Sequence, residues 1–585
     1  MERGAVADAL DEIATLLELL GENPFKVRAH ANAARTLRGL DRDLGALIAS
    51  GELRKTKGIG EALSRKIATL WASGELPYLE ELRTRVPRGL LEWLGIPGLG
   101  PKRARTIHER LGIATLGELE YLCRQGRLRD LDGFGEATER KILEGIERLR
   151  RDSGRHLQPL VRREAARLLA ILRRTEGVLR AEVAGSVRRR TETSGNVDLV
   201  AAAGRPRPVL EAFASSPGVT EVIERGPDRC TVRLESGPPA DLRVVPDRSF
   251  PFALARATGS RAHHAALVAR ARRLGLDLDA DRMTRREAGS AVECADEEAI
   301  FRELGLPWIP PELREDEGEI EAAEGGRLPR LVEAGDLRGV LHCHSSWSDG
   351  LATVAEMAEG ARALGMSYLG LADHSRAAAY AGGLSPDRFR EQWKEIDALN
   401  RVYGDSFRIL RGVEVDVLPD GSLDFPDDFL EEFELVVASI HGRFGLDRDA
   451  QTERLVRAAR HPLVDMIGHP TGRLLLARDP YPLDLHRVLQ AAAECGVAVE
   501  VNAHPQRLDL DAQGLRYGLA RGMRTSVNPD AHSVEGLRDV EYGIGVARRG
   551  WCGAESVMNA WPLGRLLRHL ATRRREARRT RGRPD

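Results

Sequence analysis

The spacing of apolar residues divides the chain into a helical first part, a short sheet-forming part and a long repeating part. Over residues 1–150, apolar positions recur at three- and four-residue intervals, which is typical of amphipathic helices. Residues 181–245 hold short β-branched runs bounded by turn residues and predict a small sheet, while residues 262–304 return to helix and loop. The pattern therefore predicts helical domains followed by a small α+β unit.

The second half of the chain repeats one unit, a short apolar run followed in most cases by a helical segment. Seven such runs can be recognised: GVLHCHS, YLGLADHS, ILRGVEVDV, LVVASIHG, DMIGHP, AVEVNAH and RTSVNPDAH. Alternating strands and helices favour a parallel sheet, so we predict a seven-stranded (β/α) barrel in a multidomain α/β protein. Each run carries a His, Asp or Glu at or near its C-terminal end, where barrel folds place their chemistry.

A change in composition separates the two halves. The stretch 310–331 combines prolines, a glycine pair and dense acid, and it is the best candidate linker in the sequence. At 585 residues the chain is also too long for one core. We expect the segments 1–78, 79–150, 151–248, 249–311, an acidic linker 312–330, 331–570 and a basic, disordered tail 571–585.

Charge is divided between the halves. Lys and Arg exceed Asp and Glu by 7 over residues 1–311, whereas the acids are in excess by 9 over residues 331–570. This division suggests a polyanion binder in front of a carboxylate-rich metal site, although ordinary charge fluctuation between domains would look the same.

Cysteine usage and the first residues indicate the cytoplasm. The six cysteines are scattered without a CxxC pair, which fits a reducing compartment and argues against a disulfide framework or a cysteine zinc site. The sequence MERGAVADALDEIATLLELLGENPF is acidic and amphipathic, so it predicts a helix and not a signal peptide. Because no run of about 18 apolar residues is present, no membrane span is expected.

Nine candidate metal ligands lie along the repeating part. They are His342, His344, Asp349, His374, Glu414, His441, His469, Asp530 and His532. Oxygen and nitrogen ligands without a thiolate suit Zn²⁺, Mn²⁺ or Fe²⁺, and nine are too many for one ion, so we expect two or three ions bridged by Glu414. A lone strand-end histidine is usually a hydrogen-bonded surface residue, but recurrence at seven consecutive strands favours a metal site that hydrolyses phosphoesters.

In this order the nine positions resemble the PHP (polymerase and histidinol phosphatase) metal-hydrolase domain over residues 331–570. The strings HPTGRLL (469–475), PQRLDL (505–510) and DAHSVEGL (530–537) resemble the form of this domain attached to bacterial family X DNA polymerases. The resemblance implies a 3′-5′ exonuclease that uses two or three Mn²⁺ or Zn²⁺ ions. His504, beside Asn502, is expected to support a ligand or to contact substrate.

Three glycine hairpins precede this domain: KGIGEALSRKI (57–67), PGLGPKRARTI (97–107) and DGFGEATERKI (132–142). A tight Gly-x-Gly turn that leads into a basic helix is the helix-hairpin-helix signature, whose backbone N–H groups bind DNA phosphates without reading sequence. One such turn could have many causes, but three basic copies favour DNA binding. The expected DNA-contacting residues are Gly58, Gly60, Gly98, Gly100, Gly133 and Gly135.

The sheet-forming part contains AGSVRRRTETSGNVDLVAAA (184–203), which resembles the palm motif of family X polymerases and of the wider nucleotidyltransferase superfamily. The resemblance implies a palm at 151–248 and a nucleotide-selection subdomain, thumb or fingers, at 249–311. The implied nucleotide-binding residues are Gly185, Ser186, Arg189 and Gly195, and the implied catalytic carboxylates, which would hold Mg²⁺ or Mn²⁺, are Asp198 and Asp241.

The palm motif departs from the family pattern at its first carboxylate. Asn196 stands there, and a neutral amide lends no charge to a two-metal site. An aromatic pair, an Asn and an Arg of the family are replaced by Arg256, Ala257, His264 and Val268. We therefore expect polymerase activity to be weakened.

The segment GENPFKVRAHANAARTL (21–37) resembles the small lyase-like, 8-kDa-type domain of the same family. That domain would span 1–78 with the first hairpin, and a helical DNA-binding domain with the other two would span 79–150. The resemblance implies that the Schiff-base lysine of the lyase-like domain is Lys66, and a buried or cation-flanked lysine can act as a nucleophile. We favour the alternative that Lys66 contacts a phosphate.

Three functional hypotheses follow. The leading one is a cytoplasmic, monomeric DNA-repair protein whose PHP domain trims 3′ ends on gapped or nicked double-stranded DNA, while its polymerase fold positions that DNA. The second is a working gap-filling polymerase that takes dNTPs and tolerates Asn196. The third is a small-molecule phosphatase with an appended binding module, against which the hairpins and the palm motif count.

Overall fold

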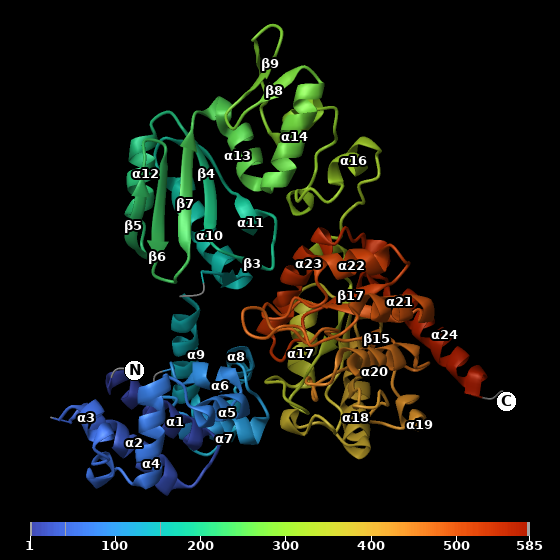
Figure 1. Cartoon of the computed structure of the whole chain (residues 1–585). Helices are drawn as coiled ribbons and strands as arrows, with labels where there is room; N and C mark the ends of the chain where they lie inside the picture. Colours follow the sequence, from blue (N-terminus) through green and yellow to red (C-terminus); the bar gives the residue numbers. More distant parts are fainter. Residues whose placement is uncertain (1–2, 41, 97, 152–153, 582–585) are drawn as a thin grey trace. The chain divides into compact units, whose positions relative to one another are not determined.

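The computed structural model describes residues 3–40, 42–96, 98–151 and 154–581, which divide into two compact units, 1–149 and 150–585 (Figure 1). The first unit is helical, as predicted, with one core that includes Leu10, Leu37 and Trp93. Its helices are α1 (Arg3–Leu19), α2 (Pro24–Arg38), α3 (Leu44–Ala49), α4 (Glu61–Ser73), α5 (Pro77–Arg85), α6 (Arg88–Trp93), α7 (Pro101–Leu111), α8 (Leu116–Arg124) and α9 (Glu136–Arg151), with short 3-10 turns η1 (Leu53–Lys55) and η2 (Arg127–Asp130).

The second unit begins with a five-stranded sheet in the order β2-β4-β7-β6-β5, within the part predicted to form one. One face packs against α10 and α12 and the other against α13. The bounds are β1 (His156–Leu157), α10 (Gln158–Arg174), β2 (Val178–Val183), α11 (Gly185–Arg188), β3 (Thr193–Ser194), β4 (Val197–Ala203), α12 (Pro206–Ala214), β5 (Val219–Arg225), β6 (Arg229–Leu234), β7 (Pro239–Val245), η3 (Asp247–Ser249) and α13 (Phe250–Thr258).

A smaller subdomain follows the sheet. It contains α14 (Arg261–Arg273), the three-stranded sheet of β8 (Leu276–Leu278), β9 (Met283–Arg285) and β10 (Ala291–Val292), and α15 (Glu297–Glu303). Its apolar core joins Phe252 of α13 to Leu267, Ile300 and Leu304.

The acidic stretch 312–330, which we expected to be a linker, is folded instead. It contains the end of η4 (Pro311–Leu313) and all of α16 (Glu319–Glu324), and Leu313 and Ile320 belong to the core of the preceding subdomain. Two of its acidic residues are buried, and each lies beside a basic side chain that is distant in the sequence. Glu319 Oε1 lies 2.5 Å from His263 Nδ1, and Glu312 Oε1 lies 2.7 Å from Arg548 Nε.

The remainder of the unit is a parallel seven-stranded barrel, as predicted, with its strands in chain order. It is nearly closed, because the His344 N–H at the end of β11 donates to Ala531 O, beyond β17, at 2.9 Å. The strands are β11 (Gly339–Cys343), β12 (Tyr368–Leu371), β13 (Arg408–Asp416), β14 (Leu435–Ser439), β15 (Met466–Ile467), β16 (Ala498–Asn502) and β17 (Thr525–Asn528).

Helices and short turns precede, connect and follow the barrel strands. The longer ones are α17 (Val354–Ala363), α18 (Pro386–Tyr403), α20 (Arg448–Arg460), α21 (Leu485–Cys495), α22 (Ala512–Leu519) and α23 (Val540–Arg549). The shorter ones are η5 (Ala334–Asp336), η6 (Ala379–Ala381), η7 (Gly404–Ser406), α19 (Asp427–Leu430), η8 (Glu535–Asp539), η9 (Ala554–Ser556) and η10 (Met558–Ala560). Within the described residues, no helix has the length and apolar character needed to span a bilayer.

The basic tail that we expected to be disordered from residue 571 is helical instead, because α24 runs from Leu563 to Arg581. Two of its arginines have partners on the barrel: Arg573 donates to Cys495 O at 2.9 Å, and Arg574 Nη2 lies 2.6 Å from Asp465 Oδ2. Asp465 is 1% exposed, so the barrel needs a cation at this place. Residues 582–585 lie outside the described residues.

Replacing Arg574 with alanine should lower the free energy of unfolding by about 3–5 kcal/mol, because the buried Asp465 would lose its closest cationic partner. Arg575, one residue on and exposed, is the matched control. Denaturant unfolding of both variants tests the prediction, and equal midpoints would contradict it.

Candidate functional site

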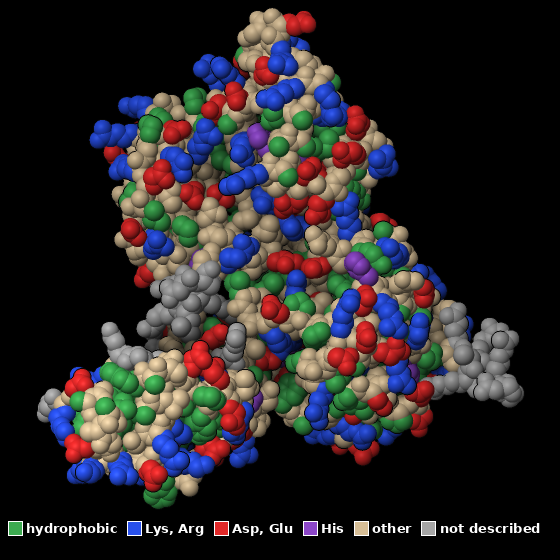
Figure 2. All heavy atoms as spheres, viewed as in Figure 1, with side chains coloured by type: hydrophobic (Ala, Val, Ile, Leu, Met, Phe, Trp, Pro, Cys, Tyr) green, Lys and Arg blue, Asp and Glu red, His purple; other side chains and the backbone are tan. Residues whose placement is uncertain are grey.

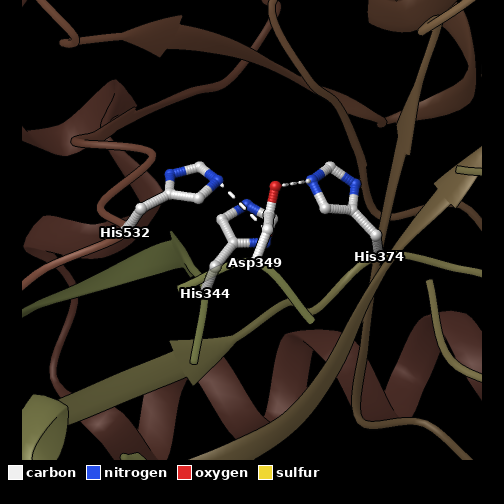
Figure 3. Close-up of side chains that lie close together, drawn as sticks. All are labelled: His344, Asp349, His374 and His532. Atoms are coloured by element: carbon white, nitrogen blue, oxygen red, sulfur yellow. Dashed lines mark ion pairs between the residues drawn. The ribbon is translucent and has the colours of Figure 1, made fainter. Parts of the chain in front are cut away.

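The structure brings the nine predicted ligands together at the C-terminal ends of the barrel strands. Three groups have ligand atoms within 4.8 Å of one another. They are His344, Asp349, His374 and His532 (Figure 3), then His342, His344 and Asp530, and finally His374, Glu414 and His441. His469 joins this cluster through Glu414, 3.0 Å away. Strand ends around a closed sheet converge, which is why residues up to 190 positions apart meet here.

Glu414 lies at the centre of the cluster and is fully buried. Its Oε1 atom is 3.3 Å from His342 Nε2, 3.2 Å from His441 Nε2 and 3.0 Å from His469 Nε2. Its Oε2 atom is 3.0 Å from His374 Nδ1. Both oxygens thus face histidines from different strands, which is the arrangement that a bridging carboxylate requires.

A second carboxylate lies between histidines on another side of the cluster. Asp349 Oδ2 is 3.5 Å from His374 Nε2, and Asp349 Oδ1 is 3.4 Å from His532 Nε2 (Figure 3). His344 stacks on His532, with ring centroids 4.2 Å apart. Asp530 completes this side from a backbone with a φ of 52°, a left-handed conformation that is costly outside glycine and that persists here because the surrounding structure holds it.

The carboxylates carry the negative charge that divalent cations need. They also outweigh burial and raise the pKa values of His342 and His374 well above the ordinary one, so a metal ion would have to replace protons on these imidazoles. Burial raises the pKa values of Asp349 and Glu414, but the neighbouring histidines outweigh it and hold both well below their ordinary values. Burial, then His532 and His374, lower the pKa of His344 to about 3, so its imidazole is neutral, as a metal ligand must be. Among the described residues, His342 Nε2 is buried without a hydrogen bond although it faces Glu414 at 3.3 Å. The nitrogen and oxygen atoms of the cluster therefore suit the binding of a metal ion better than a complete network of hydrogen bonds.

Sequence reasoning missed the residues that orient the ligands. Glu500 Oε1 lies 2.8 Å from His342 Nδ1, and Glu500 Oε2 accepts from the His469 N–H at 2.9 Å. Asp416 Oδ1 lies 3.3 Å from His441 Nδ1. Such partners fix the tautomer of a metal-binding histidine. One sequence signal could have revealed them: an acidic residue inside an apolar strand, as in AVEVNAH, must have a partner because burying an unpaired charge is costly.

Asn502 and His504 lie beside these residues. Asn502 Nδ2 is 3.1 Å from Asp530 Oδ2 and 3.2 Å from Glu500 Oε2, so it orients a predicted ligand. The His504 N–H donates to Asn502 Oδ1 at 3.1 Å, and His504 Nδ1 accepts from the Gln506 N–H.

The palm carboxylates lie side by side, but Asn196 lies between them. β4 and β7 are parallel neighbours with Asp198 opposite Asp241. The Asn196 amide nitrogen is 2.8 Å from Asp198 Oδ1 and 2.8 Å from Asp241 Oδ2, so it donates to both. Burial, then Asp241, raise the pKa of Asp198 to about 6. A Cβ at Gly185 would lie 1.9 Å from Asp198 Oδ2, which explains the glycine there.

The predicted phosphate-binding arginine has other partners in this structure. Arg189 Nε lies 2.8 Å from Glu315 Oε1, and its Nη1 donates to Thr258 O at 2.7 Å. The same Glu315 oxygen is 2.8 Å from Arg549 Nη1, on barrel helix α23. An incoming nucleotide would therefore have to displace Glu315 from Arg189. The other predicted nucleotide-binding residues remain beside it, with Ser186 Oγ hydrogen-bonded to Ser194 Oγ one residue before Gly195.

The glycine hairpins of the first unit adopt the predicted turn. The first glycine of each has a left-handed backbone, with φ of 88° at Gly58, 86° at Gly98 and 85° at Gly133. The second glycine directly precedes α4, α7 or α9. Within the described residues, a Cβ built on that second glycine meets no atom within 4 Å at Gly60, Gly100 or Gly135. The entry to each helix is therefore open to a phosphate backbone.

Lys66 projects from α4 into a partly buried setting. Its Nζ is 3.1 Å from His30 Nε2 and 3.6 Å from the centre of the Tyr78 ring. Burial, then the charge of Lys26, lower its pKa. A lowered pKa favours the neutral amine that a nucleophile needs, although the same position also suits a phosphate contact.

Comparisons with known proteins agree with this architecture. Residues 1–76 match a helix-hairpin-helix domain, 90–148 a SAM-like helix-hairpin-helix tandem, 253–315 the DNA polymerase beta thumb and 341–504 the PHP domain. The PHP domain is metal-dependent. The thumb match extends into the segment that we expected to be a linker.

The relatives differ in how much of the chain they match. "Probable phosphatase" proteins of Thermoanaerobacter sp. (strain X514) and Acetivibrio thermocellus are 28% and 32% identical over 29% and 26% of the chain, covering 70% and 59% of their own lengths. "DNA polymerase/3'-5' exonuclease PolX" of Bacillus subtilis (strain 168) is 35% identical over 96% of the chain and 98% of its own length. The chain therefore belongs to the bacterial PolX family, in which a family X-type DNA polymerase fold is joined to a PHP domain.

Proposed function

We propose that this chain is a DNA-repair exonuclease that removes nucleotides from 3′ ends at gaps and nicks in double-stranded DNA. The observation that carries the proposal is the buried cluster of His342, Glu414, Asp530 and their neighbours in a PHP domain joined to DNA-binding helices. The name of the B. subtilis relative, which includes a 3′-5′ exonuclease, supports the polarity. The proposed cofactors are two or three Mn²⁺ or Zn²⁺ ions, and the proposed state is a monomer in the cytoplasm.

The roles of the residues follow from their geometry. When bound, clustered divalent ions activate water and stabilise in-line displacement at phosphorus. Glu414 would bridge ions held by His342 of β11 and by the histidines that follow β12, β14 and β15. Asp349 and Asp530 would supply the remaining charge. Arg507, 7% exposed with its Nε 3.6 Å from Asp530 Oδ2, is a cation beside the cluster that can face a phosphate.

The proposed DNA anchor is the first unit. A surface pocket of about 610 Å³ lies between α2 and the first hairpin. Arg35, Arg42 and Lys57 line it together with Gly58. Cations beside an open hairpin suit contact with a DNA phosphate. We place this contact at a gap or nick, where a strand end is exposed. Lys66 would contact the same strand. Schiff-base chemistry by its amine is the alternative, and borohydride trapping on an abasic 5′ end would detect it.

Deleting residues 1–150 should remove most of the affinity for gapped DNA, because the proposed contacts are hairpin amides and Lys or Arg to phosphate. The DNA affinity of the full chain should fall steeply with salt: the logarithm of the binding constant should change with the logarithm of the salt concentration with a slope of about −0.9 per phosphate contacted. The affinity should vary little with DNA sequence. Fluorescence anisotropy of a labelled gapped duplex measures both effects. An unchanged dissociation constant after the deletion would rule out the hairpins as the anchor.

The palm supports a second candidate function, gap filling with dNTPs and Mg²⁺ or Mn²⁺. The neighbouring Asp198 and Asp241 support it, but Asn196 lies between them and Glu315 holds Arg189. We therefore propose that the polymerase is weakened and mainly positions DNA. An assay on a one-nucleotide-gapped duplex with Mn²⁺, with and without dNTPs, separates extension from resection. The partial matches to "Probable phosphatase" proteins favour a third candidate, hydrolysis of small phosphate monoesters. Faster turnover of a monoester than of a primer–template would support it.

A further inference from the structure

An exposed tyrosine borders the candidate metal centre. Tyr380, in η6, is 36% exposed, and its ring centroid lies 6.4 Å from that of His374 and 6.3 Å from that of His441. The side chains of these two predicted ligands are only 6% and 8% exposed. The tyrosine ring therefore flanks the cluster on its solvent side.

The loop that carries this tyrosine is fixed to the barrel next to a ligand. The Leu384 N–H donates to His374 O at 2.8 Å, so the loop leaves β12 at this ligand and returns to the ligand's own backbone. A Cβ on Gly383 would lie 1.9 Å from Ser375 O, and only glycine permits this close return. The position of Tyr380 is thus set by the same strand end that positions His374.

A second apolar residue is exposed on the adjoining loop. Leu351 is 59% exposed, and its N–H donates to the backbone oxygen of His532, another predicted ligand, at 2.6 Å. A Cβ on Gly382 would lie 3.3 Å from Ser348 O, which shows that the Tyr380 loop packs against the Leu351 loop. Two exposed apolar side chains therefore lie on adjoining loops beside a cluster that is otherwise charged.

We propose that Tyr380, with Leu351 on the adjoining loop, forms the surface on which the terminal nucleobase of the substrate strand stacks while its phosphodiester lies at the metal centre. This inference rests on the proposed exonuclease function. Histidines and carboxylates around metal ions select only for phosphate, so selection for a nucleotide needs another group. An aromatic ring supplies this selection, because every base has a face that can stack on it. Stacking of this kind gives no sequence preference. A base must leave its partner to reach the ring, so frayed ends would be preferred.

The test compares two 3′ ends on one single strand, a normal nucleotide and an abasic tetrahydrofuran residue, with Mn²⁺ and the full chain. The Tyr380→Ala variant should remove the normal nucleotide about tenfold more slowly than wild type and the abasic residue at an unchanged rate. Tyr380→Phe, which keeps the ring, should behave as wild type. Equal slowing at both ends would overturn the stacking surface, because the loss would then be structural. A wild-type chain that removes neither end would contradict the proposed exonuclease itself.

A binding measurement checks the same contact without turnover. With Ca²⁺ in place of Mn²⁺, 2-aminopurine at the 3′ terminus should lose fluorescence when wild type or Tyr380→Phe binds, and should keep most of it with Tyr380→Ala. A probe at an interior position is the matched control and should respond alike in all three proteins. Terminal quenching that is the same with Tyr380→Ala as with wild type would overturn the proposal.

Discussion

Replacing both His342 and His344 with alanine is expected to abolish DNA hydrolysis and to strip bound metal, while affinity for DNA stays nearly unchanged. Both side chains are fully buried; His342 Nε2 faces Glu414 Oε1 at 3.3 Å, and His344 Nε2 faces Asp530 Oδ1 at 3.1 Å. Loss of a residue that only orients a metal ligand typically lowers metal affinity or activity by about 10- to 100-fold. Loss of two direct ligands should therefore reduce the rate of hydrolysis by more than about a thousandfold. The proposed DNA anchor lies in the other unit and would remain.

Elemental analysis, nuclease rate and DNA anisotropy on the same preparation test this prediction. The matched control is His486→Ala, because His486 is an exposed histidine of α21 that stacks on Tyr517 and lies outside the ligand groups. It should keep metal, rate and affinity. Unchanged metal content in the double variant would contradict the ligand assignment, and a parallel loss of DNA affinity would show that the two functions are not separate.

Asn196→Asp is expected to restore part of a polymerase activity that is absent or very slow in the natural chain. The amide now donates to Asp198 and Asp241 at 2.8 Å each, whereas an aspartate would add a charged ligand that two Mg²⁺ ions can share. Recovery should be incomplete, because Glu315 still holds Arg189 and a misplaced nucleotide reacts slowly. Primer extension must be measured in the His342/His344 double variant so that resection does not remove the product.

The unfolding temperature of Asn196→Asp provides a second test. Three carboxylates within hydrogen-bond distance repel one another without a cation, so Asn196→Asp should unfold at a lower temperature than the natural chain in chelator and should gain more from added Mg²⁺. Asn196→Ala, which removes the amide without adding a ligand, is the control; it should not extend primers and should gain less from Mg²⁺ than Asn196→Asp. Vigorous extension by the natural palm would place gap filling first among the proposed functions.

The sequence by itself determined the elements and the candidate ligands, because both are encoded locally. Short β-branched or apolar runs predicted the small sheet and the seven barrel strands, helical spacing predicted the first unit, and the structure confirms them. Eight of the nine candidate ligands could be read because they stand at or near a strand end, and parallel strands bring those ends together; Asp349 lies further along the loop after β11. The hairpin glycines were readable because the turn needs a left-handed residue.

Only the tertiary structure decided which charges are buried. The stretch 312–330 and the tail from 571 look solvated because their charges are dense, yet Glu312 meets Arg548 and Arg574 meets Asp465, more than 100 residues away in each case. Likewise, nothing near Arg189 in the sequence indicates Glu315 as its partner. A charge can be buried when a partner of opposite sign lies beside it, and the folded chain, not the local pattern, places that partner.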